Sequence, residues 1–223
     1  SKSKLTDESA AWVRFGLENA DAALAQLGLA LPADVDSVAR HESLIAIRVS
    51  PGRVELWAPA EQADELKTHL RATLTEAELN SWLLGQIRAG IGQVMPATRE
   101  LFIPQMLNLQ AVGGVSFKKG CYTGQEIVAR MQYLGKLKRR LYRLQLDAGE
   151  LPEPGTALFS PAHGSTIGEV VIAAQAERNI ELLAVLQAEA AEEGNVHLGS
   201  LEGPILNLLD LPYELDRDRE IQR

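Results

Sequence analysis

The chain has 223 residues, of which 46% are hydrophobic and 23% are charged, and its formal net charge is −8 at pH 7. These values match folded globular domains and exclude the disordered and fibrous classes. No apolar run approaches the ~18 residues of a membrane span and no leader pattern follows Ser1, so we expect a cytoplasmic protein without a membrane partner.

The first elements along the chain are expected to be a strand, a helix and a hairpin. Residues 10–17 form an apolar, strand-like run, and Asn19 is a candidate cap for a helix that ends at Gly28. Residues 44–57 contain two strand-like runs joined by a Pro51-Gly52 turn, which favours a hairpin.

Two helices are expected next. Apolar residues recur at helical spacing from Ala63 to Leu70. A second helix is expected to begin at Thr75, because Glu78 stands three residues on in the capping-box position. Its buried stripe would consist of Leu79, Trp82, Leu83 and Ile87. This order of strands and helices predicts an α+β fold in which helices cover one face of an open sheet.

Residues 90–120 have the pattern of a long functional loop, since prolines and glycines interrupt every apolar run. A helix capped by Thr123 is then predicted, because the side chains of Thr123 and Glu126 fit a capping box. Its buried stripe would consist of Ile127, Val128, Met131 and Leu134. Arg130 stands four residues after Glu126, a spacing that favours an ion pair on the exposed helix face.

Beyond residue 136 the helical period gives way to strand-like runs separated by turn residues. The expected strands are residues 137–146, 156–160, 167–173 and 180–186, although residues 184–193 would also suit a helix. A small β-barrel or a sandwich is the natural assembly for these strands. We therefore expect two domains, residues 1–135 and residues 136–223.

Positive charge is concentrated between Phe117 and Arg143, where Glu126 is the only acidic residue. The eight basic residues are Lys118, Lys119, Arg130, Lys136, Lys138, Arg139, Arg140 and Arg143. They would form either a solvated face or an anion-binding surface able to meet tRNA phosphates. The histidines show no metal-ligand spacing, and a single cysteine excludes an intramolecular disulfide and an all-cysteine cluster site.

The single cysteine, Cys121, stands two residues before the expected helix cap. The positive end of the helix dipole and two neighbouring lysines, Lys118 and Lys119, would favour its reactive thiolate form there. Glycines near it, Gly120 and Gly124, would let a ligand approach the backbone closely. The alternative for a lone cysteine is a small, buried apolar side chain.

A long segment of the chain resembles the signature of the YgfZ family. It runs from Phe102-Ile-Pro-Gln-Met-Leu-Asn-Leu to Lys119-Gly-Cys-Tyr-Thr-Gly-Gln-Glu126 and on to Arg130. Its core is also similar to a Lys-x-x-Phe-Ile-Gly-x-Glu segment of the glycine-cleavage T-protein. The resemblance implies the aminomethyltransferase-like folate-binding fold, entered part-way because relatives carry a further N-terminal segment, followed by a small C-terminal β-barrel.

The same resemblance implies tetrahydrofolate as a cofactor and Cys121 as the functional thiol and a transient ligand of an iron–sulfur cluster. The residues expected to contact folate are Lys119, Gly120, Tyr122, Gly124, Gln125, Glu126, Arg130 and Arg88. Arg88 stands where relatives place a glutamate that holds the pterin ring, and a guanidinium has no acceptor for the ring's N–H groups. Arg88 would instead pair with the glutamate tail of folate, or else lie in an ion pair on an exposed helix face.

Three functions are compatible with these features. The leading hypothesis is a non-catalytic accessory protein that binds folate and supports iron–sulfur cluster assembly or repair, and thereby tRNA modification, with iron–sulfur enzymes or assembly proteins as partners. The alternative is a tetrahydrofolate-dependent aminomethyl transferase, for which Glu126 is the one candidate carboxylate. The third is a tRNA-binding protein that uses the basic segment.

Overall fold

The computed structural model describes residues 3–133 and 137–215, except for the side chains of residues 131–133. It contains two compact units, Ser1–Ala77 (the N-terminal unit) and Glu78–Arg223 (the C-terminal unit). Each unit has hydrophobic clusters of its own. Among the described residues, no helix combines the length and the hydropathy that a membrane span requires.

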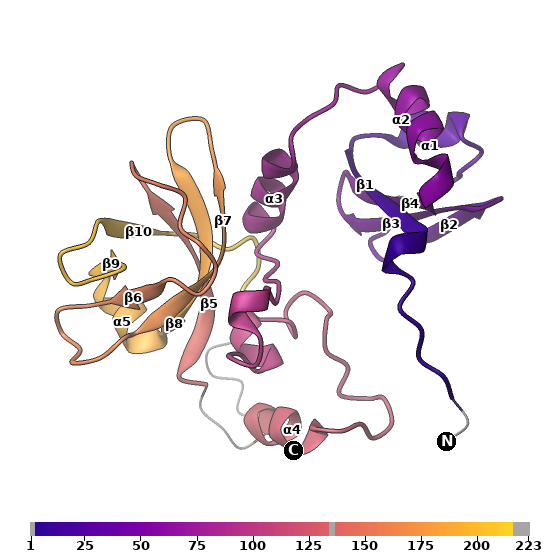
Figure 1. Cartoon of the computed structure of the whole chain (residues 1–223). Helices are drawn as coiled ribbons and strands as arrows, with labels where there is room; N and C mark the ends of the chain where they lie inside the picture. The colour runs from indigo at the N-terminus through magenta and orange to yellow at the C-terminus, as the bar shows by residue number, and fades with distance from the viewer. Residues whose placement is uncertain (1–2, 134–136, 216–223) are drawn as a thin grey trace. The chain divides into compact units, whose positions relative to one another are not determined.

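The N-terminal unit is a four-stranded antiparallel sheet in the order β1-β4-β3-β2, with helices packed on one face (Figure 1). Its elements are the 3-10 turn η1 (Ser9–Ala11), β1 (Trp12–Glu18), α1 (Asp21–Gln26), β2 (Val38–His41), β3 (Leu44–Ser50), β4 (Arg53–Pro59), the 3-10 turn η2 (Ala60–Gln62) and α2 (Ala63–Arg71).

Strand alternation decides which side chains of this sheet meet the helices. The residues that cross the sheet in register on the helix-covered face are Phe15, Leu56, Ala46 and Ala39. They pack in one cluster with Leu24 of α1 and Leu66 of α2. The next residue along each strand points to the opposite face, because the side-chain period of a strand is two.

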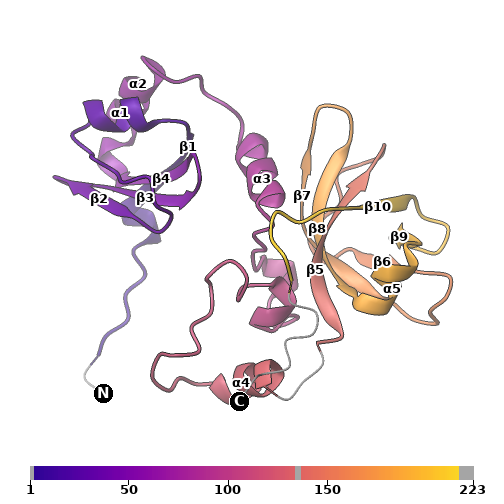
Figure 2. The same ribbon diagram turned by 180° about the vertical axis from the view of Figure 1, so that it is seen from behind.

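Six strands of the C-terminal unit close into a barrel in the order β10-β5-β8-β7-β6-β9 (Figure 2). The elements are α3 (Leu79–Arg88), the 3-10 turns η3 (Pro96–Thr98) and η4 (Pro104–Leu107), α4 (Gln125–Tyr133), β5 (Arg139–Leu146), β6 (Ala157–Phe159), β7 (Gly168–Gln175), β8 (Ile180–Gln187), α5 (Ala188–Glu193), β9 (Val196–Leu198) and β10 (Ile205–Leu209).

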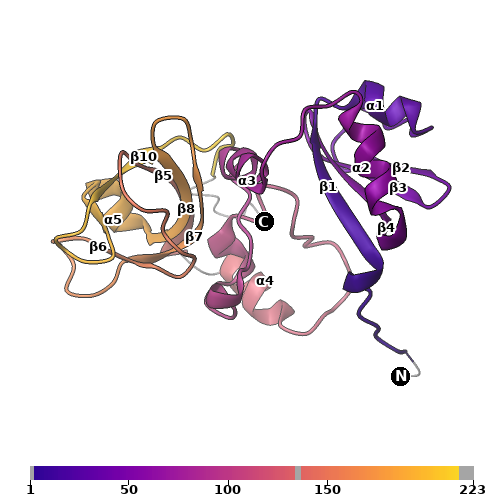
Figure 3. The same ribbon diagram turned by 45° about the horizontal axis from the view of Figure 1, so that its top comes forward.

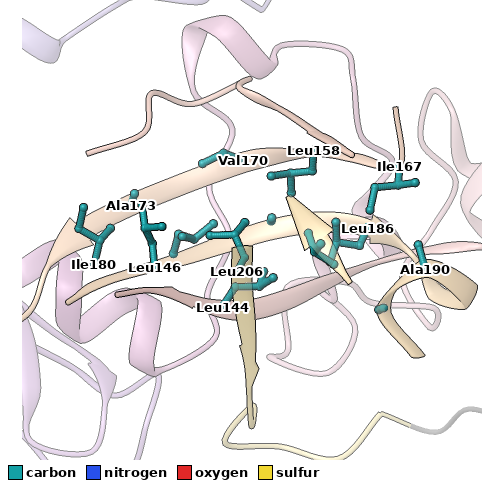
Figure 4. Close-up of a cluster of buried hydrophobic side chains, with 14 residues drawn as sticks. Leu144, Leu146, Leu158, Ile167, Val170, Ala173, Ile180, Leu186, Ala190 and Leu206 are labelled. Atoms are coloured by element: carbon teal, nitrogen blue, oxygen red, sulfur yellow. The ribbon is translucent and has the colours of Figure 1, made fainter. Parts of the chain in front are cut away.

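β8 is buried on both faces, so its sequence is almost continuously apolar. Ile180 and Leu186 belong to the inner cluster of the barrel together with Leu144, Leu158 and Leu206 (Figure 4). The alternate residues of β8 point away from this cluster. The barrel wall therefore has a second apolar face that another element must cover.

The helix α3 and the turn η4 cover that outer face (Figure 3). Ile87 of α3 and Leu107 of η4 pack with Val171 of β7 and with Leu183 and Val185 of β8. The barrel thus has one hydrophobic cluster inside its wall and another between the wall and α3. The strands β7 and β8 are held between the two clusters.

Asn80 fixes the start of α3 to the barrel. Its side-chain Nδ2 donates to the Gln175 carbonyl at 2.8 Å, and its Oδ1 accepts from the Gln175 N–H at 2.8 Å. The amide group therefore pairs with the backbone at the end of β7 as a neighbouring strand would. This pair of bonds sets the position of α3 along the barrel wall.

Most of the expected elements are confirmed. The strand at residues 10–17, the Pro51-Gly52 hairpin, the helix beginning at Ala63 and the C-terminal barrel all form. Both interpretations of residues 184–193 are partly right, because β8 continues to Gln187 and α5 follows it. The edge strand β2, with the mixed sequence Val-Ala-Arg-His, was not expected.

The predicted helix starts are wrong by a few residues. α3 begins at Leu79 instead of next to Thr75, and Glu78 is the residue before it, in an extended conformation. Asn19 has φ 50° and does not cap α1. Leu79, expected in the buried stripe of this helix, is 67% exposed, whereas Ile87 is fully buried.

The compact units divide the chain earlier than the expected domains do. The first barrel strand begins at Arg139, close to the expected domain start at residue 136. Residues 78–133, however, fall in the same compact unit as the barrel. The physical reason is the packing of α3 and η4 on the outer wall.

Candidate functional site

The Cys121 loop leads from η4 to α4, and a glycine marks its junction with the helix. The Gln125 N–H donates to the Tyr122 carbonyl at 3.2 Å, which closes a turn directly before α4. Gly124, inside this turn, has φ +85°, a left-handed conformation that favours glycine. α4 accordingly begins at Gln125, one residue later than a Thr123 cap would place it.

Cys121 is a free, exposed thiol, so the alternative of a small buried side chain is wrong. Lys119 and Tyr122 flank it: the Lys119 Nζ lies 4.6 Å from the centre of the Tyr122 ring. This cation–π contact bridges Gly120 and Cys121 and holds a positive charge on the loop. The thiol is therefore exposed on a loop that the contact between Lys119 and Tyr122 stabilises.

The two glycines of the loop have different explanations. A Cβ atom at Gly120 or at Gly124 would meet no atom within 4 Å. The positive φ accounts for Gly124, but neither backbone conformation nor packing accounts for Gly120. The space beside the Gly120 backbone, next to Cys121, is therefore open to an approaching group.

The predicted capping box does not form. In the described part of the chain, neither Thr123 nor Glu126 has a side-chain hydrogen bond, and no ion pair joins Glu126 to Arg130. Both side chains of the expected pair are exposed. The carboxylate of Glu126 is consequently available to a ligand.

Only part of the expected stripe of α4 is buried. Val128 is 7% exposed, but Ile127 is 58% exposed. The Met131 side chain and Leu134 lie outside the described residues. The buried side of α4 is held by Gln105 of η4, whose Nε2 donates to the Val128 carbonyl at 2.6 Å.

Two buried amides in and directly after η4, Gln105 and Asn108, were missed by the sequence interpretation. Gln105 is 3% exposed and Asn108 is fully buried, and neither Oε1 of Gln105 nor Oδ1 of Asn108 has a hydrogen-bond partner among the described atoms. Asn108 has φ 54°, a conformation that asparagine tolerates better than most residues. The sequence signal that could have identified Asn108 is its position directly after a turn that begins with a proline.

Asn108 connects η4 to the barrel and to the segment after β10. Its Nδ2 donates to the Leu141 carbonyl at 3.0 Å and to the Tyr213 hydroxyl at 3.4 Å. The Tyr213 hydroxyl donates in turn to the Gly90 carbonyl at 2.7 Å. Burial raises the pKa of Tyr213, and the hydrogen bond from Asn108 opposes that shift only partly. The hydroxyl thus keeps its proton for the bond to Gly90.

Arg88 is engaged by a carboxylate of the barrel. Its Nε and Nη2 donate to Glu181 Oε1 at 3.0 and 2.7 Å. Arg143 of β5 donates to the other oxygen, Oε2, at 3.1 and 2.7 Å. Glu181 thus lies between two arginines, and the ion-pair alternative for Arg88 is the one that this geometry supports.

The two arginines keep Glu181 ionised in a poorly hydrated place. Burial opposes its ionisation, but the hydrogen bonds from Arg88 and Arg143 outweigh burial and hold the pKa of the carboxyl below its ordinary value. The hydrogen bond to Glu181 likewise raises the pKa of Arg88. Arg88 therefore has a structural task at the end of α3.

The basic segment is only partly free to bind anions. Arg139 is paired with Glu169, and Arg143 is paired with Glu181. Lys136 lies outside the described residues. The basic residues for which the described structure shows no ion pair are Lys118, Lys119, Arg130, Lys138 and Arg140. No group of three or more His, Cys, Asp or Glu side chains able to hold a metal comes together in the described residues.

These elements define an aminomethyltransferase-like α+β fold with a C-terminal β-barrel. A glycine cleavage system aminomethyltransferase T from Bartonella henselae has a similar solved structure, with a TM-score of 0.56 and 17% sequence identity over 86% of this chain and 56% of that chain. At this identity the likeness concerns the fold alone. It confirms the expected fold class.

Sequence comparison shows which proteins with this fold the chain resembles in sequence. The tRNA-modifying protein YgfZ of Shigella dysenteriae is 36% identical to this chain over 204 residues, which are 88% of the chain and 62% of that protein. The proteins of the same name from Klebsiella pneumoniae and Escherichia coli are each 35% identical over the same shares. No protein-family model matches the chain. The predicted resemblance to YgfZ proteins is confirmed, and the chain spans about three fifths of their length.

Proposed function

We propose that this chain acts in tRNA modification as a YgfZ-type accessory protein, with Cys121 as its functional thiol. The observation that carries the proposal is the exposed, unpaired Cys121 in the loop that resembles the YgfZ signature. An exposed thiol can meet a partner protein, whereas a buried one serves packing. The names of the similar proteins support the link to tRNA modification.

The chemistry of the thiol in this proposal is transient ligation of an iron–sulfur cluster. One thiolate supplies one iron ligand, and common clusters need four cysteines. The remaining ligands would come from an iron–sulfur enzyme or an assembly protein bound next to the loop. A free thiol fits a reducing compartment, and the proposal accordingly includes a cytoplasmic location.

The loop also fits a folate ligand in its donor and acceptor chemistry. Glu126 offers an uncommitted carboxylate, which matches the N–H donors of a pterin ring. Lys119 and Arg130 offer cations for the glutamate tail, and the open space beside Gly120 permits close approach. The remaining proposed contacts are Tyr122, Gly124 and Gln125. Arg88 is omitted because Glu181 occupies its guanidinium.

Calorimetric titration with tetrahydrofolate tests the folate part of the proposal. Lys119→Ala should weaken binding by about ten-fold, since a charge-assisted contact to a carboxylate is lost. Lys67→Ala, which removes an exposed lysine of α2, should leave the affinity unchanged. Absence of binding heat, or an equal loss in both variants, would reject folate binding at this loop.

Complementation in cells tests the role of the thiol. Cells that lack their own YgfZ protein would receive the protein with Cys121, Cys121→Ser or Cys121→Ala, and tRNA modification and iron–sulfur enzyme activity would be measured. Both variants should accumulate normally and fail to restore either activity. Full restoration by Cys121→Ala would remove the thiol from the mechanism.

An aminomethyl transferase is the second candidate, and the uncapped Glu126 favours it. A one-carbon transfer to tetrahydrofolate needs a carboxylate to manage a proton near the folate nitrogen, and the side chain of Glu126 is free for that purpose. Glu126→Gln should then abolish formation of methylenetetrahydrofolate from an aminomethyl donor, a reaction in which the amine nitrogen leaves as ammonia. If the wild-type protein forms none of this product under the same conditions, the transferase alternative is rejected and the accessory role remains.

A further inference from the structure

The N-terminal unit has a sheet face that its described helices do not cover. Strand pairing places four residues in a single row across this face: Arg14 of β1, Trp57 of β4, Ile45 of β3 and Arg40 of β2. The adjacent row on the helix-covered face holds the buried Leu56 and Ala46. The uncovered row thus has an aromatic and an aliphatic side chain at its centre and an arginine at each end.

Trp57, the aromatic residue at the centre of the row, forms a cation–π contact with Arg14. The guanidinium carbon of Arg14 lies 5.1 Å from the centre of the Trp57 ring. The Trp57 Nε1 donates to Glu55 at 3.0 Å, which fixes the indole in its plane. In the described structure neither Arg14 nor Arg40 has an ion-pair partner, and both are exposed.

The second row extends the apolar surface. Ile47 pairs in register with Glu55 on one side and with Val38 on the other, and Val38 is 50% exposed. The surface is one face of an open four-stranded sheet. Small-molecule sites are usually concave and cover most of their ligand, so a row of side chains across an open sheet face suits an extended polymer better.

We propose that this face binds single-stranded nucleic acid. A base would stack on the outer side of the Arg14 guanidinium or on Trp57, as bases do on arginine planes and aromatic rings. Phosphates would meet Arg14 and Arg40, neither of which forms an ion pair within the described residues, on the part of the face away from the Glu55 carboxylate. Each nucleotide supplies both a ring and an anion, which is the combination that this row offers. The inference is independent of the folate and iron–sulfur roles proposed above.

Fluorescence anisotropy with a labelled single-stranded oligonucleotide of ~12 nucleotides tests the proposal. Trp57→Leu removes the stacking ring but keeps an apolar side chain, and it should weaken binding by at least about five-fold. Arg14→Gln with Arg40→Gln should weaken binding and make it less dependent on salt. Thermal unfolding of each variant verifies that the sheet remains folded.

Arg71→Gln is the matched control, because Arg71 is an exposed arginine of α2 on the helix-covered side. It should leave the affinity unchanged. The proposal is overturned if the chain binds no oligonucleotide at low salt, or if Arg71→Gln weakens binding as much as Arg14→Gln combined with Arg40→Gln. Equal competition by polyphosphate, which has no rings, or displacement by folate would overturn it as well.

Discussion

Glu181 attaches the C-terminal end of α3 to the barrel through Arg88. Its side chain is 6% exposed and its two oxygens each accept from a different arginine at 2.7 Å. We expect Glu181→Gln to lower the free energy of unfolding of the C-terminal unit by about 1–3 kcal/mol, because the largely buried Arg143 loses its anion while the Arg88 side chain, 53% exposed, is still hydrated. Urea unfolding followed by circular dichroism measures the change.

Glu76 provides a control for Glu181 in the N-terminal unit. It also bridges two cations, at 2.7 Å from Lys67 and 2.5 Å from Arg71, but its side chain is 48% exposed. Glu76→Gln should change stability by only about 0–1 kcal/mol, since exposed pairs are hydrated and screened. Equal effects of the two substitutions would contradict the assignment of Glu181 as a buried hub.

The pH dependence of stability follows from the lowered pKa of Glu181. A carboxyl whose pKa is lower in the folded state contributes stability above its unfolded pKa of ~4.3 and loses it as the pH falls through the folded value. The stability difference between the wild type and Glu181→Gln should therefore be full at neutral pH and shrink in acid. Urea unfolding at several pH values tests this, and a difference that grows in acid would disprove it.

Cys121 has no packing role that its substitution could damage. Because the thiol is exposed, Cys121→Ala should change the free energy of unfolding by no more than about 0.5 kcal/mol. Leu107→Ala, which truncates a buried side chain of η4, should cost about 2–5 kcal/mol in the same unit. Thermal unfolding compares the two, and a large loss in Cys121→Ala would mean that the thiol is buried.

At the scale of elements, α4 depends on a few contacts with η4. The hydrogen bond from Gln105 to the Val128 carbonyl, 2.6 Å long, and the buried Val128 side chain are the principal ones described. Gln105→Ala should increase hydrogen exchange in α4 while the barrel strands keep their protection. Gln145→Ala, a partly exposed glutamine of β5, should alter neither. Unchanged exchange in α4 would show that other contacts hold the helix.

Local patterns predicted the strands well and the helix boundaries less well. Two examples are the continuous apolar run of β8 and the Pro51-Gly52 turn. In each, the residues that determine the structure lie within a few positions of one another in the sequence. The start of α3 could not be found in the same way, because the contacts of Asn80 and Arg88 lie on the barrel, at Gln175 and Glu181. Such a start is decided by tertiary packing.

The candidate site likewise has features that the local sequence predicts and features that depend on tertiary contacts. The Cys121 loop could be recognised because its residues are contiguous, and its exposure agrees with a functional thiol. The capping box at Thr123 was predicted from local spacing, but the left-handed Gly124 starts the helix one residue later. The role of Gln105 depends on a contact with Val128, which no short window of sequence contains.

At the scale of the whole molecule, the two compact units have separate hydrophobic clusters, and we expect them to unfold separately. Leu56 is fully buried in the cluster of the N-terminal unit, and Leu182 is fully buried inside the barrel. Leu56→Ala and Leu182→Ala should each cost about 2–5 kcal/mol, because each leaves a cavity in a packed core.

The location of the damage distinguishes separate from joint unfolding. Leu56→Ala should raise hydrogen exchange in β1, β3 and β4 and leave β5, β7 and β8 protected, while Leu182→Ala should do the opposite. Exchange measured by mass spectrometry after peptide digestion assigns protection to each strand. If either substitution lowered protection in both units equally, the clusters would belong to one cooperative structure. In that case, a substitution in the proposed nucleic-acid face would also destabilise the unit that contains the Cys121 loop, and the two sites could not be tested independently.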